Sequence, residues 1–364
     1  MPVVPYPTAR AYAAAMAAAA LGSFLVLWAW IAFLPLAYLD PEYPFWRAKQ
    51  ELVRSCDLGD LIILGDSRAT VGILPSHLPL RATNLAVGGG KPVEAMAILR
   101  RVLTCPTPPR FALISFDPGH FMKPDLFWER SVRFGWMDRA DLRELAELSA
   151  ATGDWSVHEA RQTDGLPPAV RAALYGLRFP PYYFNSVLKS GGFLRWGTNR
   201  AGLAQGLAAR GQYYFGTAPG SDGVALDAGL DAFAPAPVLD AMFHRVLARL
   251  AASGITAWFV PLPVNDATWQ AMRPEVTAGF EAYLAAKALR HDRFAVRRVA
   301  EPHWPNQWFG DAFAHLNPAG AERLSRDLAA CLTSWQAGDP DCPMVTRIAD
   351  RASAAAGRAA ENAE

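Results

Sequence analysis

The feature that most constrains this chain is an uncharged run near its N-terminus. Between Ala11 and Leu39 there is no Asp, Glu, Lys or Arg, and the second half of the run is rich in Leu, Phe and Trp. Even a run that stops at Pro35 exceeds the roughly 20 residues that a helix needs to cross a bilayer. We therefore expect one transmembrane helix over residues 11–34, with a short N-terminus at 1–10 before it and a connector at 35–56 after it.

A cleaved signal peptide is the alternative interpretation of this run. The apolar core of a signal peptide has about 7–15 residues and is followed by small residues. Here the small residues, Ala13 to Ala20, come before the strongest apolar part, which favours an uncleaved anchor. Arg10 precedes the run, whereas Asp40 and Glu42 follow it. The positive-inside rule then predicts a cytoplasmic N-terminus and an extracytoplasmic remainder.

The composition of the chain limits its partners. Its 364 residues, 52% of them hydrophobic, suit one large domain or two small ones with a sizeable core. The formal net charge is +1, and no arginine-rich run or aromatic stacking motif is present. We therefore expect no nucleic-acid partner. The chain also has no cluster with metal-ligand spacing, so we expect no metal or other cofactor.

Apolar runs typical of buried strands alternate with helical patterns along the chain. The runs begin at Leu61, Ala82, Phe111, Thr256 and Phe294, and a last helix begins near Pro318. This alternation predicts an α/β fold with a parallel sheet that is covered by helices on both faces.

From about residue 123 to residue 237 the alternation breaks, which predicts a long insertion. It has helical patterns at 139–151 and 168–175, separated by stretches rich in Gly, Pro and Tyr. Its aromatic and arginine side chains either face a sugar, a lipid or a protein partner, or pack into an irregular core. At the C-terminus, residues 346–364 are rich in alanine and predict a disordered tail.

The four cysteines suggest two disulfides. Cys56 and Cys105 each lie just before a predicted strand, so they share the N-terminal edge of the sheet if those strands are neighbours. Cys331 and Cys342 are close in sequence beyond a helix. We expect the pairs Cys56–Cys105 and Cys331–Cys342, which are typical of an oxidising compartment. Buried free thiols are the alternative.

Two separate segments carry candidate chemistry. The first strand ends in Gly65-Asp66-Ser67, and a glycine at that bend leaves the Ser67 hydroxyl at the C-terminal edge of the sheet, where ligands bind. Asp311 and His315 lie in one loop just before the last helix. A serine, a histidine and a carboxylate are what nucleophilic acyl transfer requires. The alternative is that Ser67 and His315 are ordinary capping or turn residues.

Three sequence blocks together resemble an SGNH (GDSL-type) hydrolase. They are Gly65-Asp66-Ser67, the segment Asn84-Leu85-Ala86-Val87-Gly88-Gly89, and Asp311 with His315-Leu316-Asn317-Pro318-Ala319-Gly320. The resemblance covers about residues 58–332 without the insertion. It implies a flavodoxin-like three-layer α/β/α fold, with the SGNH-like domain at residues 57–345. It implies Ser67 as nucleophile, His315 as base and Asp311 as the carboxylate that orients it. The amides of Ser67 and Gly89 would form the oxyanion hole.

The chain departs from the family pattern at two positions. Three residues separate Asp311 from His315, where the family usually has two. The third block normally supplies an Asn after a strand, but here that position falls at Asp117, which cannot donate a hydrogen bond unless it is protonated. Either the oxyanion hole lacks this donor, or Asn265 from a neighbouring strand end replaces it.

The anchor, the Gly-Asp-Ser-Arg variant and the Gly-Gly-Gly-Lys-Pro segment resemble a narrower group. These are extracytoplasmic SGNH-like partners of membrane-bound O-acyltransferases, as in alginate or cellulose acetylation and teichoic-acid D-alanylation. The resemblance implies a single-pass inner-membrane protein with a periplasmic catalytic domain, a multispanning acyltransferase as partner and a polysaccharide as acyl acceptor. The first hypothesis is therefore an O-acyltransferase that transfers acetyl groups. The alternatives are an esterase or deacetylase, and a non-catalytic assembly partner.

Overall fold

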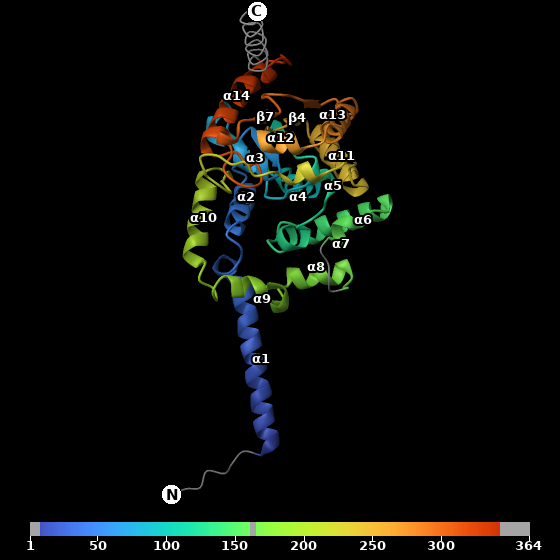
Figure 1. The fold of residues 1–364 in the computed structure, drawn as a ribbon. Coiled ribbons are helices and arrows are strands. Elements are labelled where there is room, and N and C mark those ends of the chain that lie inside the picture. Colours follow the sequence, from blue (N-terminus) through green and yellow to red (C-terminus); the bar gives the residue numbers. More distant parts are fainter. Residues whose placement is uncertain (1–7, 161–164, 343–364) are drawn as a thin grey trace, which may run out of the picture. The chain divides into compact units, whose positions relative to one another are not determined.

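The computed structural model describes residues 8–160 and 165–342 (Figure 1). These residues form two compact units, each built from two separate segments of the chain. We call residues 8–44 and 165–202 the anchor unit, and residues 45–160 and 203–342 the sheet unit. The insertion expected at 123–237 is thus shared between the two units. The tail expected at 346–364 lies outside the described residues.

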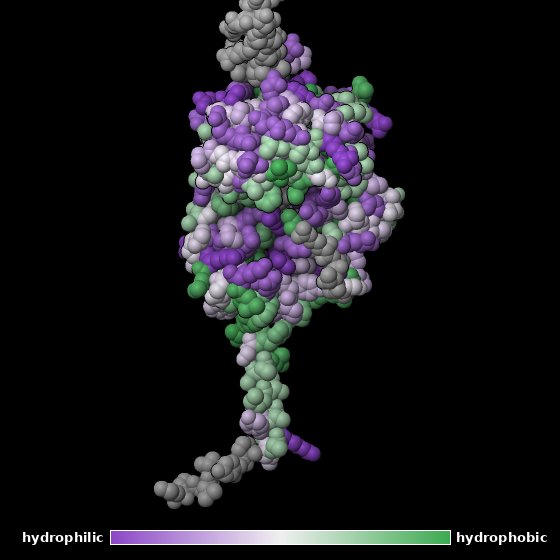
Figure 2. All heavy atoms as spheres, viewed as in Figure 1, coloured by the Kyte–Doolittle hydropathy of each residue, from purple (hydrophilic) through white to green (hydrophobic). Residues whose placement is uncertain are grey.

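In the anchor unit, helix α1 (Ala9–Phe33) carries most of the uncharged run. Its most apolar stretch has a mean hydropathy of 2.0, and by length and composition it is the one candidate membrane span among the described residues. At about 1.5 Å per residue, α1 is about 37 Å long, which exceeds the roughly 30 Å hydrocarbon core of a bilayer. Figure 2 shows most of its surface in the green of apolar residues.

Buried polar contacts hold the remainder of the anchor unit to the chain that follows α1. The Tyr38 hydroxyl donates to the Ile31 carbonyl at 2.8 Å. The side-chain amide of Asn199 donates to the carbonyls of Leu36 and Leu39, each at 3.0 Å. The other elements of this unit are η1 (Pro35–Ala37), α8 (Pro168–Gly176), α9 (Pro180–Lys189) and the start of α10 (Trp196–Ala208).

The sheet unit is built on five parallel strands in the order β2-β1-β3-β4-β6. Each strand falls within a run that the sequence predicted. Their bounds are β1 (Leu61–Gly65), β2 (Ala82–Asn84), β3 (Phe111–Ser115), β4 (Thr256–Phe259) and β6 (Phe294–Val296). The chain moves from β1 to β2 and then crosses to the other side of β1 to form β3. The strand order therefore reverses between β1 and β3, and this is where doubly wound sheets bind ligands.

Helices cover both faces of this sheet, which confirms the α/β class. Alternate side chains of a strand point to opposite faces. Leu61, Ile63 and Trp258 share a core with Leu324 and Leu328 of α14 (Pro318–Gln336). On the other face α4 (Pro92–Val102) packs against α11 (Pro237–Ala252), and α11 contacts β4.

The other elements connect these layers. Helices α6 (Arg139–Thr152) and α8 confirm the two helical patterns that the sequence predicted in the insertion. A two-stranded parallel sheet joins β5 (Val264–Asn265) to β7 (His303–Trp304). The remaining helices of the described chain are α2 (Tyr43–Arg54), α3 (Ser67–Gly72), η2 (Pro75–His77), α5 (Gly119–Met122), η3 (Phe127–Val132), α7 (Ser156–Glu159), η4 (Leu226–Gly229), α12 (Asp266–Ala271), α13 (Pro274–Ala288) and η5 (Asn306–Trp308).

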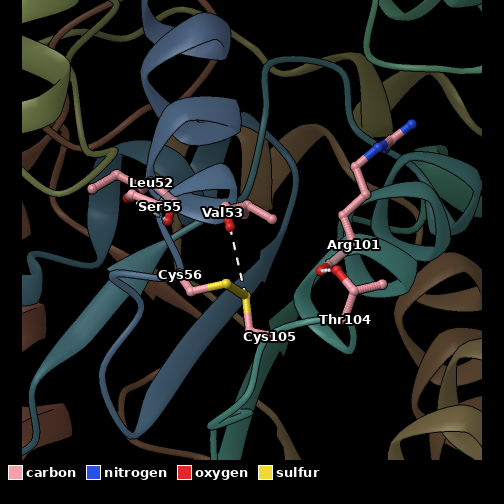
Figure 3. Close-up of a disulfide and its surroundings, with 7 residues drawn as sticks. All are labelled: Leu52, Val53, Ser55, Cys56, Arg101, Thr104 and Cys105. Carbon is pink, nitrogen blue, oxygen red and sulfur yellow. Dashed lines mark hydrogen bonds between the residues drawn. A yellow bond between two sulfur atoms is a disulfide. The ribbon is translucent and has the colours of Figure 1, made fainter.

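Both expected disulfides are present. Figure 3 shows Cys56, just after α2, joined to Cys105, which follows α4. These cysteines precede β1 and β3, which are neighbours in the sheet with Leu61 opposite Phe111, so the argument from strand adjacency is confirmed. The second disulfide joins Cys331 of α14 to Cys342. No free cysteine is present among the described residues.

Candidate active site

Ser67 lies at the first turn after β1, on the C-terminal edge of the sheet. Gly65 is required there because a Cβ at this position would lie 2.0 Å from the Ser115 carbonyl oxygen of β3. Asp66 then caps α3, its Oδ1 accepting hydrogen bonds from the amides of Arg68 at 2.9 Å and Ala69 at 3.4 Å. Ser67 is thereby held as the first residue of the helix, partly exposed, beside the point where the strand order reverses.

The structure brings Ser67, His315 and Asp311 together in a hydrogen-bonded relay. His315 Nε2 lies 2.7 Å from Ser67 Oγ, although 248 residues separate them, and His315 Nδ1 lies 2.5 Å from Asp311 Oδ2. Asp311 Oδ1 accepts from the amides of Phe313 at 2.9 Å and His315 at 3.2 Å. The three residues between Asp311 and His315 close this loop with Ala314 in the left-handed region, at φ 58°.

The charge on Asp311 decides which nitrogen of His315 carries the proton. Burial raises the pKa of Asp311, but the hydrogen bonds from His315 and the two backbone amides outweigh it, so the pKa lies below its ordinary value. An ionised carboxylate only accepts hydrogen bonds, so Nδ1 must donate. Nε2 of the neutral ring is then unprotonated and accepts from the Ser67 hydroxyl, as a general base requires.

Aromatic packing fixes the His315 ring. Phe215 stacks on it with ring centroids 4.8 Å apart and an angle of 25° between the planes, and Phe313 lies at 6.3 Å. The His315 residue is only 6% exposed. Phe215 belongs to the part of the insertion that lies in the sheet unit. Its role was not predicted, because nothing in the sequence signals which aromatic residue of an insertion reaches a loop a hundred residues later.

These groups open into a cavity of about 420 Å³. It is lined by the three residues of the relay and by side chains from the β2–α4 loop, the β3–α5 turn and the insertion. The lining residues are Ser67, Arg68, Gly89, Asp117, His120, Asp125, Leu126, Arg130, Phe215, Ala225, Leu226, Asp227, Asp311, Phe313 and His315. A larger hollow lies at the N-terminal ends of β3, β4 and β6 and contains none of the relay residues.

Two backbone amides in this cavity are available to an oxyanion. The amides of Ser67 and Gly89 have no acceptor within the part of the chain that the structure describes. Gly89 has φ 68°, which glycine adopts readily. Lys91, only 1% exposed, holds this loop by donating from Nζ to the carbonyls of Gly89 at 2.7 Å and Asp125 at 2.8 Å.

Asn265 does not reach the cavity, which corrects the idea that it replaces the missing third-block donor. It lies in β5, outside the five-stranded sheet, and is not among the lining residues. Its amide nitrogen donates to the carbonyls of Ser221 at 3.1 Å and Gly223 at 2.8 Å, and its oxygen accepts from the Thr268 amide. Asn265 therefore holds the 221–223 segment in place.

Asp117, at the third-block position, belongs to a buried charge network beside Ser67. Arg68 pairs with Asp117 at 2.8 Å and with Asp227 at 3.0 Å. Burial, with the nearby carboxylates of Asp66 and Asp227, raises the pKa of Asp117 despite the attraction of Arg68. Asp66 Oδ2 accepts from the Asp117 amide at 2.7 Å. The network ties the end of β3 to the start of α3 and so fixes the floor of the cavity.

His120 is the second histidine of the cavity, and it was not predicted as a site residue. Its Nδ1 lies 3.1 Å from Asp66 Oδ2, and its side chain is 20% exposed. Asp66, Asp117 and His120 offer ligand atoms within 4.8 Å of one another. The guanidinium of Arg68 already supplies a positive charge to Asp117, and Asp66 is used in capping α3, so the cluster is accounted for by protein contacts.

Comparison of the chain with protein-family models finds no family that matches, and comparison with curated proteins finds no relative.

Proposed function

We propose that this protein is a membrane-anchored serine acyltransferase that moves an acyl group onto a hydroxyl of a cell-envelope polysaccharide. The observation that carries the proposal is the Asp311–His315–Ser67 relay, which faces a cavity with two unpaired backbone amides. A buried relay of this kind is unnecessary for a capping serine. It is the arrangement that activates a hydroxyl for attack on an ester.

The first half-reaction forms an acyl-enzyme. Ser67 Oγ attacks the carbonyl carbon of the donor ester, while its proton passes to His315 Nε2. The carbonyl oxygen becomes an oxyanion that accepts hydrogen bonds from the amides of Ser67 and Gly89. When the carbon–oxygen bond to the leaving group breaks, His315 returns the proton to the leaving oxygen. Asp311 stays ionised and stabilises the imidazolium that exists between these two transfers.

The second half-reaction determines whether the protein is a transferase or a hydrolase. A hydroxyl of the acceptor gives its proton to His315 and attacks the acyl carbon, and Ser67 leaves with the proton returned by His315. If the attacking hydroxyl belongs to a sugar, the product is an acylated polymer; if it belongs to water, the product is a free acid. The polar groups that line the cavity, including Arg130 and Asp125, suit a sugar acceptor.

The membrane features support the more specific form of the proposal. One apolar helix precedes the sheet unit, and two disulfides are typical of a chain outside the cytoplasm. The strand order, 2-1-3-4-5 when the five strands are numbered along the chain, is the flavodoxin-like order that SGNH hydrolases would require. We infer membership of that superfamily, with a multispanning O-acyltransferase as the partner that supplies the acyl group.

The test uses the full chain in detergent, with a chromogenic acetyl ester as donor and an oligosaccharide as acceptor. The matched variants are Ser67→Ala and Ser253→Ala, since Ser253 is exposed at the end of α11 and outside the cavity. We expect acetylated sugar from wild type and Ser253→Ala, and none from Ser67→Ala. Free acetate without acetylated sugar would indicate an esterase. If Ser67→Ala and wild type behave alike, the protein is not a serine acyltransferase.

A further inference from the structure

The anchor unit contains a segment whose charge differs from that of the rest of the chain. Residues 165–202 hold five basic residues and no acidic one, whereas the whole chain has 35 basic and 34 acidic residues. The basic residues are Arg171, Arg178, Lys189, Arg195 and Arg200. Of these, Lys189 and Arg200 are exposed. Such a segment favours contact with an anionic surface.

The same segment exposes large apolar side chains. On α9, Phe184 is 54% exposed and Leu188, one turn later, is 61% exposed, while Tyr183 and Val187 in the neighbouring row are buried. Leu194, beyond the helix, is 79% exposed. Helix α9 therefore has a second apolar row that no described residue covers. We call Phe184, Leu188 and Leu194 the apolar row.

This segment packs on the part of α1 that would lie in lipid. The ring centroid of Phe179 lies 6.2 Å from that of Phe24 and 5.5 Å from that of Trp28. Trp28 Nε1 also donates a hydrogen bond to the Leu177 carbonyl at 2.8 Å. At about 1.5 Å per residue, Trp28 and Phe24 lie about 8 and 14 Å before the end of α1. A hydrocarbon core of about 30 Å centred on α1 includes both.

A hollow beside α1 continues this apolar surface. It is lined by Ser23, Val26, Leu27, Trp30 and Phe193, and the rings of Trp30 and Phe193 lie 4.9 Å apart. Green atoms in Figure 2 continue from α1 into the region where Figure 1 labels α9. Exposed apolar surface that is continuous with a membrane span, and bordered by cations, is typical of a segment lying in the membrane interface.

We propose that residues 177–196 lie in the bilayer interface at the C-terminal end of α1. The apolar row enters the acyl boundary, and Lys189 and Arg200 contact anionic lipid headgroups. The occupant of this surface is lipid, because the row adjoins the membrane span and because the two exposed cations, Lys189 and Arg200, complement anionic headgroups. The inference rests on α1 crossing a bilayer and is independent of the chemistry at Ser67.

The test measures immersion depth in the full chain, reconstituted into phosphatidylcholine vesicles with and without phosphatidylglycerol. Spin labels are attached at Phe184→Cys, Leu188→Cys and, as the aqueous control, Leu289→Cys, whose native residue is 89% exposed in the sheet unit. We expect the labels at 184 and 188 to collide readily with oxygen and poorly with a water-soluble nickel chelate. The label at 289 should show the opposite preference.

Two results would overturn the proposal. Nickel accessibility at 184 and 188 equal to that at 289 would place the apolar row in water. Low accessibility to both oxygen and nickel would mean that protein, such as a second copy of the chain, covers it. The headgroup contact is tested separately. We expect the labels at 184 and 188 to lie deeper in vesicles that contain phosphatidylglycerol. In the variant Lys189→Gln/Arg200→Gln, this lipid should no longer increase their depth. If the depth is the same with and without phosphatidylglycerol, the proposed headgroup contact is wrong.

Discussion

Asp311 is the residue whose replacement most directly tests the relay. We expect Asp311→Asn to lower kcat by about 10³–10⁴ with little change in KM, as loss of the orienting carboxylate does in serine enzymes of this type. The physical reason is that an asparagine amide can donate to Nδ1, which moves the ring proton to Nε2 and removes the acceptor of the Ser67 proton. Steady-state kinetics with the chromogenic ester measure this effect.

The control for this variant is Asp222→Asn, because Asp222 is exposed and lies outside the cavity. Its kinetics should match those of wild type. If Asp311→Asn retained more than about a tenth of the wild-type kcat, the carboxylate would not be setting the tautomer of His315.

The lowered pKa of Asp311 also predicts a pH dependence of stability. Hydrogen bonds from His315 and two amides favour the ionised carboxylate in the folded chain. Their contribution is therefore complete above the ordinary aspartate pKa of about 3.9 and is lost as the pH falls through the lower folded value. The difference in melting temperature between wild type and Asp311→Asn should be constant near neutral pH and shrink below about pH 4.

Differential scanning fluorimetry of the full chain in detergent measures this difference. Ser67→Ala is the reference, because it disturbs the site without removing the carboxylate. The difference in melting temperature between Ser67→Ala and wild type should not vary over the same pH range. A difference for Asp311→Asn that grows as the pH falls would contradict the direction of the shift.

At the scale of elements, the loop between β2 and α4 depends on Lys91. Its Nζ fixes the carbonyl of Gly89, so it positions the loop that carries one of the two proposed oxyanion donors. We expect Lys91→Met to lower kcat by up to about 10², the cost of losing one such donor, while KM changes little. Affinity for a boronate analogue of the tetrahedral intermediate should fall by the same factor.

Lys287→Met is the matched control for this loop, because Lys287 is also a buried lysine, paired with Asp240 at 2.6 Å and outside the cavity. It should destabilise the fold without lowering kcat. Equal losses of kcat in both variants would mean that Lys91 acts only through overall stability.

The disulfide between Cys56 and Cys105 should stabilise the fold more than the second disulfide does. It closes a loop of 49 residues, whereas Cys331–Cys342 closes one of 11. The loop-entropy relation predicts that opening the first costs about 4 kcal/mol of unfolding free energy and opening the second about 3 kcal/mol. Urea titration of Cys56→Ala/Cys105→Ala and Cys331→Ala/Cys342→Ala compares them. A larger loss in the second pair would contradict the ordering.

Much of the element structure could be predicted from local patterns. The strand at Leu61 ends at residues with clear turn chemistry, and the helix at Pro318 begins at residues with clear capping chemistry. Their positions could therefore be predicted from the sequence. The relay could be predicted because Asp311 and His315 lie in one loop. Contacts that depend on the path of the insertion, such as Phe215 on His315 or Asp227 on Arg68, could not, because no periodicity links them.

At the scale of the whole molecule, the insertion serves both units. Residues 165–202 complete the anchor unit around α1, and residues 203–237 supply Phe215 and Asp227 to the cavity beside Ser67. The sequence predicted one insertion with aromatic and arginine residues but did not show this division. The division depends on which residues pack together over long stretches of chain, and such packing leaves no local signal in the sequence.

The orientation of the chain in the membrane can be tested through the redox state of its cysteines. Arg10 before α1 and the acidic residues after it predict that the sheet unit lies outside the cytoplasm, where disulfides form and persist. If cells are quenched with acid, denatured and treated with a polyethylene-glycol maleimide, we expect all four cysteines to be unreactive in the wild-type chain. A chain from which residues 1–34 have been deleted stays in the cytoplasm, so its cysteines should all react. Cysteines that react in the full chain would indicate the opposite orientation, because the reducing cytoplasm would then surround both pairs.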